Sequence, residues 1–114
     1  TGRATPGHVL PVIEPVVAQH GSERIVAHYH DTFDQGLANA LWSWNAGVTA
    51  FDASAGGLGG CPYSPGATGN IATESLVHMF DGLGVETGFD LEKLASATRG
   101  IESCLGRPLK SAFK

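Results

Sequence analysis

Cysteines, clusters of basic residues and long hydrophobic runs are all scarce in this chain of 114 residues. Its two cysteines, Cys61 and Cys104, are too few for a disulfide scaffold and are typical of a reducing compartment. Seven Lys and Arg against eleven Asp and Glu give a net charge of -4, so we expect no nucleic-acid partner. No apolar run approaches the ~18 residues needed to cross a bilayer, so we expect a soluble protein without a membrane contact.

The nearest approach to a basic cluster lies close to the end of the chain. It consists of Arg107, Lys110 and Lys114. We interpret these residues as a solvated end of the chain, because they are too few to form a binding patch for phosphates.

Glycine is abundant, with 16 residues, and is densest on both sides of Cys61. Such a loop can present a thiol to a substrate. The loop follows an apolar segment, residues 48–53, that is typical of a short buried strand, and it leads into a predicted helix at residues 71–80. A strand, a long loop and a helix in this order are where enzymes commonly place catalytic residues.

The hydrophobic pattern predicts alternating helices and strands in a single domain of class α/β. Two short strands alone cannot form a stable parallel sheet, because such sheets need both faces covered and both edges protected. We therefore interpret residues 1–114 as a partial domain, which is either part of a larger α/β barrel or dependent on a partner chain. The predicted elements are a helix ending near Gly21, a strand at 24–30, a helix at 34–46, a strand at 48–53, a helix at 71–80 and a last helix capped by Asp90.

Two histidines near the end of the first strand could bind a metal ion. His28 and His30 are two residues apart, so in a strand their side chains project to the same face. The alternative is that both are simply hydrogen-bonded at the strand end. Asp31 follows as a possible supporting group, and Asn70 could add an amide oxygen. This ligand set suits a divalent ion such as Mg or Mn better than a closed zinc site.

Two polar residues after the glycine-rich loop have both a functional and a structural interpretation. Asn70 could be a metal ligand or the N-cap of the following helix. Glu74 lies one turn later, and it could hold a neighbouring group of the site or only favour the helix dipole.

Cys61 is the candidate acid or base of this loop. It lies between Gly60 and Pro62, where little side-chain bulk surrounds the thiol. The alternative is a small buried residue of the core, which is also our interpretation of Cys104. The loop is no usual phosphate cradle, because no Gly-Lys-Ser/Thr follows and its glycines do not fit G-x-G-x-x-G.

Taken together, these segments resemble 3-hydroxy-3-methylglutaryl-CoA (HMG-CoA) lyase, in register from about Thr5 to the last helix. The resemblance implies a (β/α)8 TIM barrel, of which this chain would be the C-terminal part, namely the last two strand-helix units and the C-terminal helices. The segments that carry it are His28-Tyr29-His30-Asp31-Thr32, Gln35-Gly36-Leu37-Ala38-Asn39, Gly57-Leu58-Gly59-Gly60-Cys61-Pro62-Tyr63 and Gly69-Asn70-Ile71-Ala72-Thr73-Glu74.

The resemblance further implies a divalent-metal-dependent cleavage of HMG-CoA to acetyl-CoA and acetoacetate, as in leucine degradation and ketone body metabolism. His28, His30 and Asn70 match the metal ligands of the family and Cys61 its catalytic loop cysteine, while His28 would also move a proton. The family's aspartate ligand and neighbouring catalytic arginine, on the first strand, have no counterpart here. The implied partners are an acyl-CoA substrate, the missing N-terminal part of the barrel and further copies of the complete enzyme. The implied location is cytoplasmic, or mitochondrial in a eukaryote.

Two alternatives remain open on the sequence. The related acyl-CoA condensing enzymes, such as isopropylmalate and homocitrate synthases, also use two histidines and a glycine-rich turn, but their pattern lacks the loop cysteine. A non-catalytic structural or interaction module would leave His28, Asn70 and Cys61 as a strand end, a cap and a core residue. Convergence of the two imidazoles and the Asn70 oxygen on one point would favour the enzyme.

Overall fold

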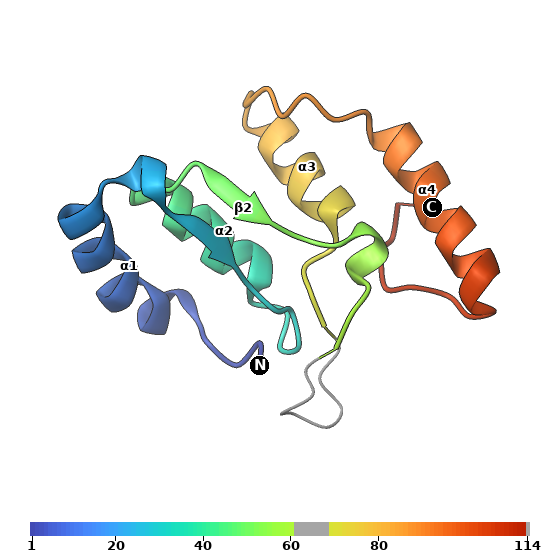
Figure 1. Cartoon of the computed structure of the whole chain (residues 1–114), viewed down its shortest axis with the longest axis horizontal. Coiled ribbons are helices and arrows are strands. Elements are labelled where there is room, and N and C mark those ends of the chain that lie inside the picture. Colours follow the sequence, from blue (N-terminus) through green and yellow to red (C-terminus); the bar gives the residue numbers. More distant parts are fainter. Residues whose placement is uncertain (61–68, 114) are drawn as a thin grey trace.

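The computed structural model describes residues 1–60 and 69–113, and these form an α/β arrangement (Figure 1). The order of elements agrees with the alternation expected from the sequence. The elements are α1 (Pro6–His20), a 3-10 turn η1 (Ser22–Arg24), β1 (Val26–His28), α2 (Gly36–Asn45), β2 (Ala50–Asp52), a second 3-10 turn η2 (Ala55–Gly57), α3 (Thr73–Gly82) and α4 (Leu91–Leu105).

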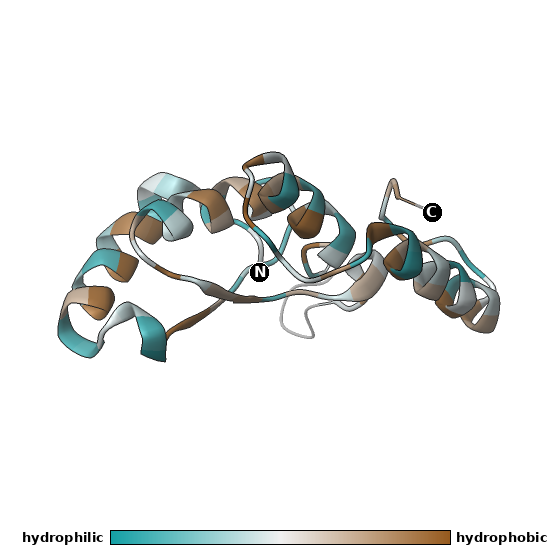
Figure 2. Cartoon of the chain, turned by 90° about the horizontal axis from the view of Figure 1, so that it is seen from above, coloured by the Kyte–Doolittle hydropathy of each residue, from teal (hydrophilic) through white to brown (hydrophobic). Residues whose placement is uncertain are grey.

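The two strands lie side by side in parallel, with Val26 opposite Ala50 and His28 opposite Asp52. The helices lie on one side of the strands, and the opposite face of the sheet is bare in the described part of the chain (Figure 2). Val26, on that bare face, is 61% exposed, whereas Ala27 points to the helices and is buried. A parallel sheet with one bare face is incomplete by itself, because parallel sheets in proteins are covered on both faces.

The hydrophobic core lies between the sheet and helices α2 and α3. Phe80 of α3 is buried at its centre, and its ring contacts the rings of Trp44 and Phe51 with centroids 5.2 and 5.5 Å away. These distances are those of favourable aromatic pairs. Trp44 of α2 therefore packs against α3.

Strand β1 is shorter than the predicted strand at 24–30, and helix α3 begins two residues later than predicted. The strand begins late because Arg24 belongs to the turn η1, and the other differences arise from two isolated bridges. His30 pairs with Asn70 in an isolated antiparallel bridge, and Ser54 pairs with Ala72 in a parallel one. The backbone before α3 is thus extended and hydrogen-bonded to neighbouring segments, so Ile71 and Ala72 cannot belong to the helix.

Helix α4 begins as expected, because the Asp90 carboxylate accepts hydrogen bonds from the backbone N–H groups of Glu92 and Lys93. The interpretation of Cys104 as a core residue is wrong, since this cysteine is exposed. Only Ala95 and Thr98 of α4 are buried, so the second half of the helix leaves the core. In residues 1–60 and 69–113 no helix is both long and apolar enough to cross a membrane.

The C-terminal segment is solvated only in part, since Arg107 and Lys110 are exposed as expected but the neighbours of Lys110 are not. Leu109 and Ser111 are buried, and the backbone N–H of Lys110 donates to the carbonyl of Gly56 at 3.1 Å. Gly56 has a φ of 64° and lies so close to Leu109 that an added Cβ would fall 2.6 Å from a Leu109 methyl group. The chain after α4 therefore returns to pack on the turn η2.

Candidate functional site

The two predicted histidines lie side by side where β1 ends. His28 is the last residue of β1, and His30 follows in the bridge with Asn70. The ring centroids are 5.1 Å apart with the planes at 66°. Nδ1 of His28 donates to the carboxylate of Asp52, which stands opposite it in the sheet. The histidines thus remain neighbours although the regular strand stops between them.

Asn70 stands next to His30 and does not cap a helix. The N-cap of α3 is Ala72, so the interpretation of Asn70 as a cap is wrong. The Asn70 amide Nδ2 donates to the carbonyl of Leu58 at 3.0 Å, which fixes the side chain against the glycine-rich loop. Four buried side-chain atoms have no hydrogen-bond partner among the described residues: Nδ1 of His30 and Oδ1 of Asn70 at this bridge, and two others on Thr32 and Asn39.

The His28 and His30 side chains line a cavity of about 340 Å³ with Tyr29, Asn39 and the first four residues of the chain. Burial lowers the pKa of His30, and the neighbouring His28 lowers it further. A lowered pKa keeps the imidazole neutral near pH 7, which is the form that binds metal ions.

Asp31 is held by two segments at once. Its carboxylate accepts from the backbone N–H of Gly36 at 2.8 Å and from Nζ of Lys110 at 3.2 Å. Lys110 Nζ also donates to the Asp31 carbonyl at 3.0 Å and to the Asp34 carboxylate at 3.3 Å. The residue after His30 is thus tied both to the start of α2 and to the C-terminal segment.

Burial alone would lower the pKa of Lys110, but hydrogen bonds and negative charges from Asp31 and Asp34 together raise it above its ordinary value. We expect Lys110→Met to lower the free energy of unfolding by under ~1 kcal/mol, because the ammonium group is partly exposed. A raised pKa in the folded state gives stability that is complete below the unfolded lysine pKa and is lost as pH rises through the folded value. Urea unfolding at neutral and alkaline pH measures this. If Lys110→Met lowered the free energy of unfolding more at high pH than at neutral pH, this expectation would be contradicted.

Glu74 is fully buried, and its carboxylate ties three segments together. It accepts from the backbone N–H of Gly56 with both oxygens, at 3.1 and 3.0 Å, and from the hydroxyl of Thr98 on α4. Glu74 therefore does more than favour the dipole of α3. It holds the turn η2, which leads into the glycine-rich loop, and none of its hydrogen bonds among the described residues goes to Asn70.

The two ends of the glycine-rich loop lie against each other beside Asn70. A Cβ added to Gly69 would fall 2.0 Å from the Gly59 carbonyl oxygen, so no larger residue fits at this close approach. Cys61, the predicted catalytic residue of the loop, lies outside the described residues. Gly59 and Gly69, which lie on either side of that segment, are thus next to Asn70, a predicted metal ligand.

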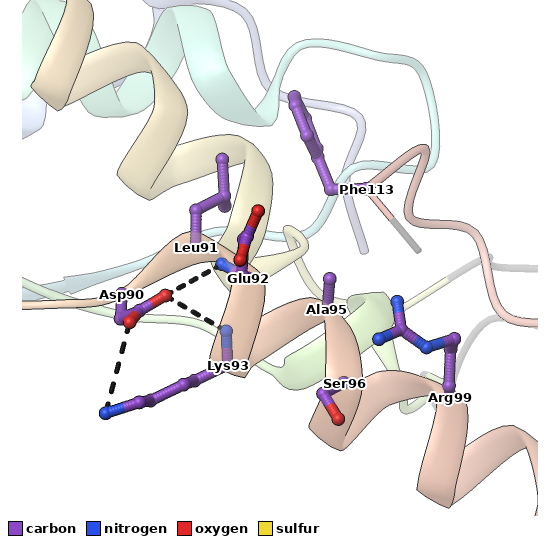
Figure 3. A pocket seen from close by; sticks show the side chains of 8 residues that line it. All are labelled: Asp90, Leu91, Glu92, Lys93, Ala95, Ser96, Arg99 and Phe113. Atoms are coloured by element: carbon purple, nitrogen blue, oxygen red, sulfur yellow. Dashed lines mark hydrogen bonds and ion pairs between the residues drawn. The ribbon is translucent and has the colours of Figure 1, made fainter.

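A second cavity, of about 690 Å³, lies at the start of α4, between Asp90, Lys93, Arg99 and Phe113 (Figure 3). It contains none of the site residues predicted from the sequence. Among residues 1–60 and 69–113, no group of three or more His, Cys, Asp or Glu side chains is close enough to hold a metal ion. The candidate site of the described chain is therefore the pair of histidines with the amide oxygen of Asn70.

Sequence reasoning missed Asp52, the partner of His28, and Thr98, the partner of Glu74. Asp52 had a usable signal, since it closes a strand just as His28 does. Thr98 had none, because a threonine inside a polar helix carries no sign of its buried contact.

Comparison with known proteins decides the family. The family model described as HMGL-like matches residues 1–101 of this chain. The chain belongs to the HMGL-like family. It is an α/β fragment of the TIM barrel domain of that family, related to HMG-CoA lyases.

Three relatives define the level of similarity to this HMGL-like chain. The mitochondrial hydroxymethylglutaryl-CoA lyase of Arabidopsis thaliana is 50% identical over 94% of this chain and 23% of its own length. The (R)-citramalyl-CoA lyase of Chloroflexus aurantiacus is 45% identical over 96% of this chain and 34% of its own. A solved HMG-CoA lyase from Acinetobacter baumannii, in complex with coenzyme A and 3-methylmalate, superposes with a TM-score of 0.92 at 40% identity, over 98% of this chain and 37% of that one.

The HMGL-like chain thus spans 23 to 37% of the length of these three relatives. A parallel sheet with one bare face is what we expect of a chain that spans only part of the barrel domain. The structure places His28 beside His30, and His30 opposite Asn70 in an antiparallel bridge.

Proposed function

We propose that this chain is the C-terminal segment of a (β/α)8 barrel that binds a divalent cation, Mg or Mn, and cleaves HMG-CoA to acetyl-CoA and acetoacetate. His28, His30 and Asn70 would hold the cation in this proposal. The rest of the barrel would supply the remaining ligand and an arginine, and we expect the complete enzyme to be a homo-oligomer. A bacterial enzyme would act in the cytoplasm and a eukaryotic one in mitochondria, as the relatives suggest.

The observation that carries the proposal is the pair of unpartnered buried atoms at the bridge between His30 and Asn70. A buried polar atom without a partner costs about 1–3 kcal/mol, so folded proteins rarely leave one without a reason. Here an imidazole nitrogen and an amide oxygen are both in this state on two paired residues. Nitrogen and oxygen donors of this kind fit a divalent cation.

The chemistry explains why these residue types are needed. A bound divalent cation would polarise the C3 hydroxyl of the substrate and lower its pKa. Because Nδ1 of His28 is bonded to Asp52 and its other nitrogen would bind the cation, the hydroxyl proton would pass to a base from the rest of the barrel, and Cys61 would donate a proton to the departing acetyl-CoA carbanion. Asp31 and Glu74 would act in support, the first by fixing the segment after His30 and the second by fixing the turn η2 before the loop.

The test uses the complete enzyme, meaning this segment joined to the remaining part of its barrel. We expect Asn70→Ala to weaken Mn²⁺ binding at least about tenfold, because an oxygen ligand is lost. Mn²⁺ binding is followed by electron paramagnetic resonance, and cleavage of HMG-CoA by release of acetoacetate. Asn45→Ala, at the exposed end of α2, is the matched control and should bind Mn²⁺ like the unchanged enzyme. Unaltered Mn²⁺ affinity in Asn70→Ala would remove Asn70 from the ligand set.

A second candidate is a lyase for another branched 3-hydroxyacyl-CoA. It is favoured by the 45% identity to the (R)-citramalyl-CoA lyase of Chloroflexus aurantiacus, which is close to the 46% identity to the hydroxymethylglutaryl-CoA lyase of Bacillus subtilis. Both reactions break a carbon–carbon bond next to a hydroxyl-bearing carbon, so the same residues would serve. Relative kcat/KM values for HMG-CoA and citramalyl-CoA, measured on the complete enzyme, separate the two candidates.

A further inference from the structure

Asp52 has no role in the proposal so far, yet it contacts a residue at the centre of the site. It is the last residue of β2 and stands opposite His28, the last residue of β1, in the parallel register. Register partners in a sheet project to the same face, so both side chains extend from the bare side of the sheet. The Asp52 carboxylate accepts a hydrogen bond from Nδ1 of His28.

This contact decides which nitrogen of His28 is free. A carboxylate can only accept, so Nδ1 must carry the proton. In the neutral ring the lone pair is then on Nε2, at the far side of the imidazole from Asp52. Half of the His28 side chain is exposed, so few other contacts fix the ring orientation.

Other carboxylates nearby are already committed. Asp31 is bonded to Gly36 and Lys110, and Asp34 also bonds to Lys110. Among the described residues, the carboxylate that is hydrogen-bonded to the histidine pair is that of Asp52, which accepts from His28. A carboxylate behind a metal-binding histidine fixes its tautomer and raises its basicity, and its loss typically costs 10- to 100-fold in affinity.

We propose that Asp52 is a positioning residue that holds His28 in the Nδ1–H tautomer and presents its Nε2 lone pair to the site. The inference rests on the proposed function only for what Nε2 meets there, a divalent cation. The contact with Asp52 itself is independent of any cation. The two parts can therefore be tested separately.

The first measurement is made on the complete enzyme without metal, with ¹⁵N-labelled histidine, by two-bond ¹H–¹⁵N correlation spectra at about pH 8, where imidazoles are neutral. His28 signals are assigned by their loss in His28→Gln. We expect the Nδ1–H tautomer in the unchanged protein and in Asp52→Asn, whose amide oxygen still accepts from Nδ1. We expect the Nε2–H tautomer in Asp52→Ala, and Asp52→Val serves in the same way if the alanine variant does not fold.

The second measurement is Mn²⁺ affinity by electron paramagnetic resonance. We expect about tenfold weaker binding in Asp52→Ala and a smaller loss in Asp52→Asn. Asp81→Asn, an exposed carboxylate on α3 that bonds to Thr87, is the control and should change neither measurement. An unchanged His28 tautomer in Asp52→Ala would overturn the inference. If the His28 tautomer changes in Asp52→Ala but the unchanged enzyme binds no Mn²⁺, the positioning contact is upheld and the proposed function is overturned.

Discussion

Glu74→Ala should lower the free energy of unfolding by about 3 kcal/mol. The substitution would leave the buried N–H of Gly56 and the hydroxyl of Thr98 without their acceptor, in a place that is fully closed to water. Hydrogen bonds to a charged group are worth more than neutral ones, and an unpaired buried donor costs its full desolvation. Urea unfolding of the complete enzyme, followed by circular dichroism, measures the loss.

Two further variants separate the contacts of Glu74 from the mere volume of its side chain. Thr98→Val keeps the size of the residue and removes the donor, so we expect a loss of about 1–2 kcal/mol. In the double variant the two losses should not add, because both remove the same hydrogen bond. Glu14→Gln, on the exposed side of α1, is the control and should stay within about 0.5 kcal/mol of the unchanged protein. Strictly additive losses would show that Glu74 and Thr98 are not coupled.

The predictable part of this structure is what local patterns specify. Apolar spacing and glycine stops predict the order of helices and strands, and the capping carboxylate of Asp90 predicts the start of α4. His28 and His30 could be placed together because a two-residue spacing puts side chains on one face of a strand. The recognisable loop sequence then predicts the family, which the match of residues 1–101 confirms.

What could not be predicted depends on contacts between distant parts of the chain. Glu74 bonds to a threonine 24 residues later, and Lys110 bonds to an aspartate 79 residues earlier. Neither pair has a local signal, because a carboxylate on a helix and a lysine near a chain end are usually solvated. The same holds for the late start of α3, since extended pairing of Ile71 and Ala72 with remote strands overrides their helical pattern.

The site shows the same division between local and remote determinants. The residue types of His28, His30 and Asn70 are readable, but the unpartnered state of the buried His30 and Asn70 atoms exists only in the fold. Asp52 is opposite His28 because of the parallel register, which a sequence of two short strands does not define. Sequence therefore indicates which groups a site contains, while the fold determines how each group is oriented.

The other large effect is expected at Cys61. In the complete enzyme, Cys61→Ala should lower turnover roughly 10²-fold or more, which is the usual size of a lost acid or base. The loop that carries it starts and ends beside Asn70, where Gly59 and Gly69 approach each other closely. A proton donor is needed near the cation ligands in the proposed reaction, and the alanine variant keeps those ligands. Mn²⁺ binding should therefore stay nearly unchanged while acetoacetate release falls.

Cys104 provides the matched control for this prediction. It is the other cysteine of the chain and is exposed on α4. Cys104→Ala should retain full turnover, because the last turns of α4 contribute no buried contact through this side chain. The comparison also separates two roles for Cys61. Loss of turnover together with loss of Mn²⁺ binding would indicate a structural cysteine, whereas loss of turnover alone is the result expected of a proton donor, and unchanged turnover would remove Cys61 from the reaction.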